Sequence, residues 1–389
     1  MRKVFQKNSF FFCYLLSRLG DEVLVFLIPL LAYTTTGDVS KSGLLLTAEW
    51  IPRLIALNLV GPCVDRYGAK RLVMAADFLR FILLVSSCIS LLFYYSQVHF
   101  HLLIAMSVFI GIATEISYVA TEVLIVRDLP THAGNSQKLT QSIDQLARVL
   151  APALAIWAHT KLALSSIFVW TALFVFLNLL AVSVSVPYLP VSRDKNNSSY
   201  FCLGFFLIST DSVLRSLSSM AFVANLAFGI ALSTLSYFVI GVFGHSESMV
   251  GYVVGMSAFV SIITLYSLRG SLTTHHQAAM ASLVFIAALI GLRFAPNFPV
   301  FALSYVFFGS AAGVLSLYVR SVRATVCSKD VLGRVTGIMV FINSASYPIS
   351  GFLVFMFGQA HISQVLNFII VVVCIQMTLF LKQILNINF

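Results

Sequence analysis

Residues 162–186 read LALSSIFVWTALFVFLNLLAVSVSV, a run of 25 positions without a charged side chain. An α-helix rises about 1.5 Å per residue, so about 20 apolar residues cross the hydrocarbon core of a bilayer. The run does not alternate between apolar and polar side chains, as a strand of a membrane barrel would. It therefore predicts a transmembrane α-helix.

The rest of the chain has the same character. Of 389 residues, 59% are hydrophobic and only 10% are charged, and the mean hydropathy is +0.95. Soluble domains carry about 25% charged residues, so this composition excludes a soluble protein and predicts an all-α membrane protein. Apolar windows bounded by charged and turn residues predict twelve spans. Their approximate limits are 10–33, 42–64, 72–94, 102–126, 139–159, 162–186, 217–242, 248–268, 278–294, 298–320, 335–358 and 361–382.

Lysine and arginine set the predicted orientation. Of the 24 basic residues, seventeen lie at the termini or in loops on the same side of the membrane. The positive-inside rule then places both termini in the cytoplasm, here of a bacterial inner membrane. The net charge of +10 comes without a basic stripe interleaved with aromatics, so no nucleic acid partner is expected. We expect a monomer whose partners are the lipid bilayer and a small-molecule substrate.

One long polar interval divides the chain. Residues 187–215 contain PYLPVSRDKNNSSY and predict a cytoplasmic linker between six-helix bundles at 1–186 and 216–389. Basic and proline positions also recur at an offset of 196 residues. The matched positions are Arg127 with Arg323, Lys138 with Arg334, and Pro152 with Pro348. Duplicated, pseudo-symmetric halves of this kind are common among secondary transporters.

The loop after the second span carries a motif. It reads Gly61-Pro-Cys-Val-Asp65-Arg66-Tyr-Gly68-Ala-Lys70-Arg71 and resembles the GxxxDRxGxKR signature of the major facilitator superfamily, at the same place in the topology. The resemblance implies alternating access and a latch whose contacts hold the two halves in one state. The alternative is a basic loop that only sets topology. The predicted latch residues are Gly61, Asp65, Arg66, Gly68, Lys70, Arg71 and Arg127.

The fifth span resembles one branch of this superfamily. Residues 135–154 are similar to drug–proton antiporters, a branch that includes macrolide and siderophore exporters. That motif usually reads GxxxGPxxGG, whereas Ala147, Ala151 and Ala155 stand at glycine positions around Pro152. Alanine still permits close helix packing. The resemblance implies export driven by the proton gradient, without any cofactor.

Eleven ionisable residues fall within spans, all in the first half. They are Arg18, Arg53, Arg80 and Arg148, and Asp21, Glu22, Glu49, Asp77, Glu115, Glu122 and Asp144. Each costs at least about 2.5–3.5 kcal/mol at the bilayer centre, so these groups must face protein or a water-filled cavity. Every arginine has a carboxylate one helical turn away. The spacing predicts four local pairings: Arg18 with Asp21 or Glu22, Glu49 with Arg53, Asp77 with Arg80, and Asp144 with Arg148.

Glu115 differs from the paired carboxylates. It lies near the middle of the fourth span and has no arginine within one turn. Burial disfavours the charged form of an unpaired carboxyl group, which suits a group that loads and releases a proton. In the superfamily that the chain resembles, the first and fourth helices line the central cavity. We therefore expect proton coupling at Glu115, with Asp21 and Glu22 as alternatives.

Two arginines are candidates for binding the substrate. Arg53 and Arg148 lie near the centres of the second and fifth spans, and a guanidinium fork suits carboxylate or phenolate groups. With Glu49 and Asp144 they form the predicted substrate site. The alternative is a purely internal network of salt bridges.

Other chemistry is not indicated. The six cysteines form no CxxC pair and the spans hold no histidine cluster, so we expect no metal site and no enzyme. The sequence predicts proton-coupled export of a small organic solute, with a siderophore as the first choice. Multidrug or antibiotic efflux and siderophore import are the alternatives. Outside transport, a lipid-modifying enzyme and a receptor without flux are the remaining hypotheses.

Overall fold

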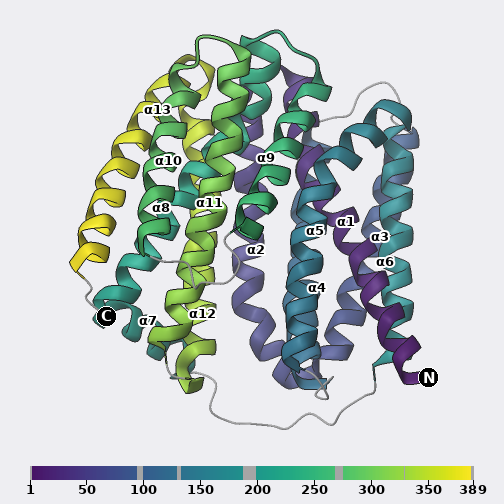
Figure 1. Ribbon diagram of the computed structural model, residues 1–389. Helices are drawn as coiled ribbons and strands as arrows, with labels where there is room; N and C mark the ends of the chain where they lie inside the picture. The colour runs from purple at the N-terminus through teal and green to yellow at the C-terminus, as the bar shows by residue number, and fades with distance from the viewer. Residues whose placement is uncertain are drawn as a thin grey trace. The chain divides into compact units, whose positions relative to one another are not determined.

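The computed structural model describes residues 2–93, 100–128, 133–186, 199–267, 275–327 and 329–386. Within these ranges every regular element is helical (Figure 1). The first half forms α1 (Arg2–Thr36), α2 (Val39–Tyr67), α3 (Ala69–Phe93), α4 (Phe100–Asp128), α5 (Ala133–Lys161) and α6 (Leu164–Ser185). The second half forms α7 (Ser199–Thr210), α8 (Ser212–Ser236), the π-helical turn η2 (Tyr237–Val242), α9 (Glu247–Ser267), α10 (His275–Phe294), α11 (Phe298–Val326), α12 (Lys329–Ser344) and α13 (Ser346–Asn386).

The chain divides into two compact units. The first unit comprises Met1–Thr36 and Ala48–Lys195, and the second unit comprises Gly37–Thr47 and Asn196–Phe389. The division passes through α2, because the beginning of this helix packs with the second unit and the remainder packs with the first. Each unit is described separately below.

Small side chains allow close packing in the first unit. Here α3 packs against α4 and α6, and α1 packs against α5 and α6. Ala147, Ala151 and Ala155 of α5 are all buried, so the alanines at the motif's glycine positions form a packing face, as predicted. On α1, a Cβ added to Gly20 would lie 2.9 Å from Cγ2 of Thr171 on α6.

The second unit contains an interrupted helix and a close approach of two backbones. Its α8 packs against α13, and α11 packs against α9 and α10. Gly358 adopts a φ of +58° and splits α13 into two helices. A Cβ added to Gly43 of α2 would lie 2.5 Å from the carbonyl oxygen of Gly351 on α13, and a Cβ on Gly351 would lie equally close to the carbonyl oxygen of Gly43. The two backbones leave no room for a side chain at this crossing.

All twelve predicted spans correspond to helices. Spans one to six match α1 to α6, the seventh matches α8 with η2, and spans eight to ten match α9 to α11. The eleventh span combines α12 with the part of α13 before Gly358, and the twelfth is the rest of α13. The chain is therefore an all-α protein with six long membrane helices from each half.

Eight helical segments of the described residues are long and apolar enough to cross a membrane. The last of these segments contains both the eleventh and the twelfth spans. Helices α1, α2 and α5 are outside this group. They carry seven of the eleven intramembrane charges, which lowers their hydropathy, so burial inside the first unit has to compensate for these charges.

The interval predicted as a linker is partly helical. Residues 187–198 lie outside the described ranges, while α7 and the first turn of α8 lie within 187–215. Asp211 caps α8, because one carboxylate oxygen accepts hydrogen bonds from the backbone N–H groups of Val213 and Leu214 at 2.8 and 2.9 Å. The apolar run at 201–208 therefore belongs to a short helix ahead of the seventh span.

Candidate functional site

Charged side chains from α1 to α5 meet inside the first unit, and all four intramembrane arginines form ion pairs there. The pairs are Arg18 with Asp21, Glu22 and Asp144; Arg53 with Glu49; Arg80 with Asp21 and Asp77; and Arg148 with Glu22. Five of the seven carboxylates are thus bound to at least one arginine. This pairing makes so many charges tolerable between membrane helices, since an unpaired charge would cost several kcal/mol.

Arg18 of α1 is the centre of one group. Its Nε lies 2.9 Å from Oδ1 of Asp144 on α5, and its Nη2 lies 2.9 Å from Oε1 of Glu22. Its Nη1 is 3.4 Å from Oδ2 of Asp21. The guanidinium carbon also lies 4.9 Å from the centre of the Tyr118 ring on α4, within range of a cation–π contact. One side chain therefore connects α1, α4 and α5.

Arg80 and Asp77 of α3 form the most deeply buried group, with exposed fractions of 2% and 0%. They pair with each other at 2.8 Å, and Arg80 also pairs with Asp21 on α1. The hydroxyl of Ser117 on α4 donates to Asp77 at 2.6 Å, and the amide of Asn178 on α6 donates to it at 2.8 Å. Four helices are joined through these contacts. The sequence did not single out Ser117 or Asn178, because lone polar residues in spans resemble packing residues.

Three of the four predicted local pairings are present, and the fourth is wrong. Asp144 does not pair with Arg148 on its own helix. It is bound by Arg18 and by the hydroxyl of Tyr14, whose distance to Oδ1 is 3.1 Å, both from α1. Arg148, whose side chain is 51% exposed, reaches Glu22 of α1 at 3.4 Å. Spacing along one helix could not predict this exchange, because it depends on how α1 packs against α5.

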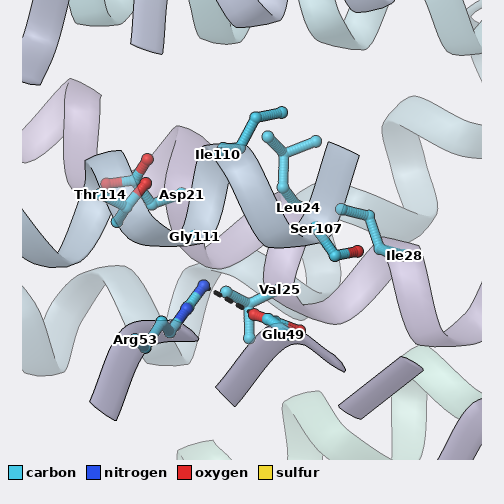
Figure 2. Close-up of a pocket in the computed structure, with 10 residues that line it drawn as sticks. All are labelled: Asp21, Leu24, Val25, Ile28, Glu49, Arg53, Ser107, Ile110, Gly111 and Thr114. Carbon is cyan, nitrogen blue, oxygen red and sulfur yellow. Dashed lines mark ion pairs between the residues drawn. The ribbon is translucent and has the colours of Figure 1, made fainter. Parts of the chain in front are cut away.

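A small cavity lies between α1, α2 and α4 in the first unit (Figure 2). The empty space between its lining atoms is roughly 290 Å³, and this volume includes open solvent. Its charged lining comes from Asp21, Glu49 and Arg53. The apolar lining comes from Leu24, Val25, Ile28 and Ile110. The cavity thus joins two predicted substrate residues with a predicted alternative proton site.

Arg53 is held tightly at this cavity. Its Nη2 lies 2.6 Å from Oε1 of Glu49, one turn earlier on α2, and its guanidinium carbon lies 5.2 Å from the centre of the Trp50 ring. A Cβ added to Gly111 of α4 would lie only 2.8 Å from Nε of Arg53. Within the described parts of the chain, that buried Nε has no hydrogen-bond partner. The sequence did not reveal the role of Gly111, which is visible only in the packing of α2 against α4.

Glu115 lies one turn after Gly111 on α4. Among the described residues, no hydrogen bond or ion pair involves its carboxyl group, and its side chain is half-buried. Arg53, Arg18 and Arg148 act on it electrostatically at longer range. Glu122, the other acid without an arginine partner, accepts a hydrogen bond from Tyr118 at 3.1 Å. Glu115 is therefore the intramembrane carboxylate with the fewest direct contacts in the described part of the chain.

The predicted latch residues are only partly visible. The side chains of Asp65 and Arg127 lie outside the described part of the structure, as do the surroundings of Gly61. Gly68 has a φ of +88°, which glycine adopts readily, and forms the sharp turn between α2 and α3. Arg66 and Arg71 are exposed.

Lys70 of the same motif lies in the first turn of α3 and has a defined role in the first unit. Its ammonium group donates to the carbonyl oxygens of Ser183 and Val186, at 2.8 and 2.5 Å. These carbonyls end α6, so Lys70 binds the negative end of that helix. The motif therefore fastens α3 to the end of α6, a contact that the sequence alone did not predict.

The described residues contain no group of three or more His, Cys, Asp or Glu side chains that could hold a metal ion. The described charges instead form a network of ion pairs beside a cavity.

Comparison with known families decides the classification. The model of the Major Facilitator Superfamily matches residues 10–380 of the chain. The chain belongs to the major facilitator superfamily. Members of this superfamily are membrane transporters of small solutes, and the twelve-helix fold in two six-helix bundles, predicted from the sequence, is confirmed.

Solved structures of the superfamily share this fold at low sequence identity. The nucleoside transporter NupG has a TM-score of 0.72 at 13% identity, covering 98% of this chain and 100% of its own. A D-xylose–proton symporter has a TM-score of 0.68 at 13% identity, covering 95% of this chain and 97% of its own. The human organic anion transporter MFSD10 has a TM-score of 0.69 at 16% identity, covering 97% and 98%. No curated protein sequence matches this superfamily member significantly.

Proposed function

We propose that this protein is a proton-coupled exporter of a small organic solute, with Glu115 as the proton carrier. The observation that carries the proposal is the contrast between Glu115 and its neighbours. All four intramembrane arginines are bound to other carboxylates, while Glu115 has no ion pair among the described residues. A carboxyl group in this position can hold a proton without breaking a salt bridge.

The alternative proton sites are less suited to this task. Asp21 is bound by both Arg18 and Arg80, and Glu22 is bound by both Arg18 and Arg148. Protonating either group would weaken two ion pairs at once, whereas protonating Glu115 breaks no ion pair among the described residues. We therefore assign Asp21 and Glu22 to the network that positions α1, and coupling to Glu115.

The charge balance bears on the solute. Seven carboxylates and four arginines lie within the spans of the first half, and both proposed anion-binding arginines are already paired, Arg53 with Glu49 and Arg148 with Glu22. An anionic solute would have to displace a glutamate from either arginine. This geometry favours a cationic or neutral solute, as in multidrug efflux, over an anionic siderophore.

A siderophore is the second candidate, and import the third. The siderophore rests on the resemblance of residues 135–154 to the drug–proton antiporter branch. The same resemblance supports export over import. A proton-coupled symporter shares the fold at 13% identity, so proton coupling is compatible with this architecture in either direction.

We also propose that the protein lies in a bacterial inner membrane with the 61–71 motif on the cytoplasmic side. There the motif would act as a latch that holds one conformation of the transporter. Gly68 and Lys70 support this role. The turn at Gly68 and the hydrogen bonds from Lys70 to the end of α6 hold the motif in place within the first unit. The exposed Arg66 and Arg71 of the motif are therefore attached to a fixed backbone.

Substitution of Glu115 tests the assignment. In inverted membrane vesicles with a respiratory proton gradient, ethidium, erythromycin or iron-free desferrioxamine is added, and proton release is followed with a pH-sensitive dye. We expect at least one probe to dissipate the gradient with the wild-type protein and none with Glu115→Gln. Gly255→Ala is the control, since a Cβ there has no atom within 4 Å. Full proton coupling in Glu115→Gln would remove Glu115 from this role.

A further inference from the structure

Arg53 has a role of its own that rests on the proposed role of Glu115. Arg53 differs from the other three arginines of the network because its pairing is incomplete. Arg18 and Arg80 each bind two or more carboxylates, and Arg148 is half-exposed at the edge of the group. Arg53 binds Glu49 alone. Its buried Nε–H has no hydrogen-bond partner in the described structure, a feature that it shares with Arg80. A buried donor without a partner is unfavourable, so Arg53 gains by moving to a position that satisfies it.

Helix geometry places a second partner within reach. Helices α2 and α4 run in the same direction, because two successive turns of the chain separate them. Arg53 lies beside Gly111, with Glu49 four residues before Arg53 on α2 and Glu115 four residues after Gly111 on α4. Four residues correspond to about 6 Å along a helix axis. Glu115 therefore lies about one turn of α4 beyond the point that Nε of Arg53 contacts, and it has no ion pair among the described residues.

Gly111 provides the space for this movement. The Nε atom packs against the α4 backbone so closely that a Cβ at position 111 would lie 2.8 Å from it. Cβ atoms essentially never approach other atoms that closely, so any other residue would push the guanidinium group away from α4. Arg53 and Gly111 both line the cavity, so empty space lies beside the guanidinium group (Figure 2).

We propose that Arg53 is a counter-ion shared by Glu49 and Glu115, and that Gly111 is the positioning residue that allows it to pass. While Glu115 is protonated, Arg53 pairs with Glu49. When Glu115 releases its proton to water in the cavity, Arg53 moves about one turn along α4 and pairs with the new carboxylate. Glu49 then loses its partner and faces the cavity as a free carboxylate, which can bind the cationic part of a solute.

The membrane spans around Arg53 and Glu115 carry eight other charged groups, and these keep their present partners while Arg53 moves. They are Arg18, Asp21 and Glu22 on α1, Asp77 and Arg80 on α3, Glu122 on α4, and Asp144 and Arg148 on α5. Except for Glu122, which is bonded to Tyr118, each belongs to an ion pair that does not include Arg53. Their fields act on Glu115 in every variant below, so they do not alter the comparison between variants.

Infrared titration tests the exchange without knowledge of the solute. The absorbance of protonated carboxyl groups is followed against pH in the purified full-length protein in liposomes, and the component absent from Glu115→Gln is assigned to Glu115. In Gly111→Ala, Arg53 is pushed away from α4, so less positive charge stabilises the carboxylate. The pH of half-protonation should then rise by about one unit or more, the usual effect of one charge at this range.

A second variant predicts a shift of opposite sign. In Glu49→Gln, Arg53 loses its present partner and becomes available to Glu115, so the pH of half-protonation should fall by a similar amount. Gly255→Ala, where a Cβ has no neighbour within 4 Å, is the control for the glycine-to-alanine change.

The outcomes separate the two proposals. If no titrating component is missing in Glu115→Gln, the proposed proton carrier is wrong. If that component exists but Gly111→Ala and Glu49→Gln leave it unmoved, or move it in the same direction, only the shared counter-ion is refuted. Should Gly111→Ala fail to fold, the fall caused by Glu49→Gln is measured again in the Arg53→Gln background, because loss of the Glu49 charge alone also lowers the pH of half-protonation. A larger fall with Arg53 present supports the exchange, and an equal fall in both backgrounds, no change or a rise overturns it.

Discussion

Asp77 and Arg80 form a buried ion pair whose role in the first unit is structural. Asp77 accepts hydrogen bonds from Arg80, Ser117 and Asn178, so each of its oxygens is occupied. The network joins α3 to α1, α4 and α6 at a depth where water cannot replace a lost partner. Its contribution is therefore structural, and it positions Asp21 at the wall of the cavity.

We predict that Arg80→Met destabilises the protein by about 3–5 kcal/mol. The substitution keeps much of the side-chain volume but leaves Asp21 and Asp77 without this counter-ion in a buried site, the situation in which breaking a salt bridge is most costly. Thermal unfolding of the purified protein in detergent measures the effect. Lys382→Ala, at an exposed position of α13, should leave the midpoint unchanged. Equal midpoints for the two variants would show that the Arg80 network contributes little.

Among the helices, the crossing of α2 and α13 in the second unit depends on two glycines. Gly43 and Gly351 place their backbones so close that a Cβ on either would lie 2.5 Å from the other's carbonyl oxygen. The hydroxyl of Thr47 donates to the carbonyl oxygen of Pro348 at 3.2 Å beside this contact. The beginning of α2 is thereby fixed to the second unit.

We predict that Gly351→Ala lowers the stability of this crossing by about 1–3 kcal/mol, the usual cost of overpacking. The new methyl group would meet both the carbonyl oxygen of Gly43 and the hydroxyl oxygen of Thr47, which lie 2.5 and 2.6 Å from its position. Gly337→Ala on α12 is the matched control, because a Cβ there has no atom within 4 Å. The unfolding midpoint should fall only in the first variant. A fall of similar size in both would point to a general effect of losing a helical glycine.

For the whole molecule, the proposed export of a cationic or neutral solute can be tested in cells. We predict that expression in a bacterial strain without its own drug exporters lowers the steady-state accumulation of ethidium several-fold. Glu115→Gln, at equal expression in the membrane, should abolish the effect, because a proton carrier is needed to use the gradient. Fluorescence of ethidium bound to intracellular nucleic acid measures accumulation.

Three other outcomes would change the proposal. Increased secretion of a siderophore, with ethidium unaffected, would support the anionic solute in spite of the paired arginines. Increased accumulation of ethidium or of a ferric siderophore would indicate import. Unchanged levels of all of them would remove both candidate solute classes.

Patterns in the sequence were enough to predict the class of the protein and most of its architecture. Long apolar runs can be satisfied only by spanning lipid, and basic loops bias their orientation, so the twelve spans were predictable one at a time. Spacing within a helix also predicted Arg18 with Asp21, Glu49 with Arg53, and Asp77 with Arg80, since residues one turn apart share a face. The signature at 61–71 pointed to the family that comparison confirmed.

Which charges meet across helices could be learned only from the packing of the helices. Asp144 is bound by Arg18 of α1 instead of Arg148 on its own helix, and Gly111 acquires its role only because Arg53 lies against it. These contacts depend on the rotation and depth at which one helix packs on another. Side-chain volumes along the whole interface set both quantities, and no pattern within a single helix encodes them.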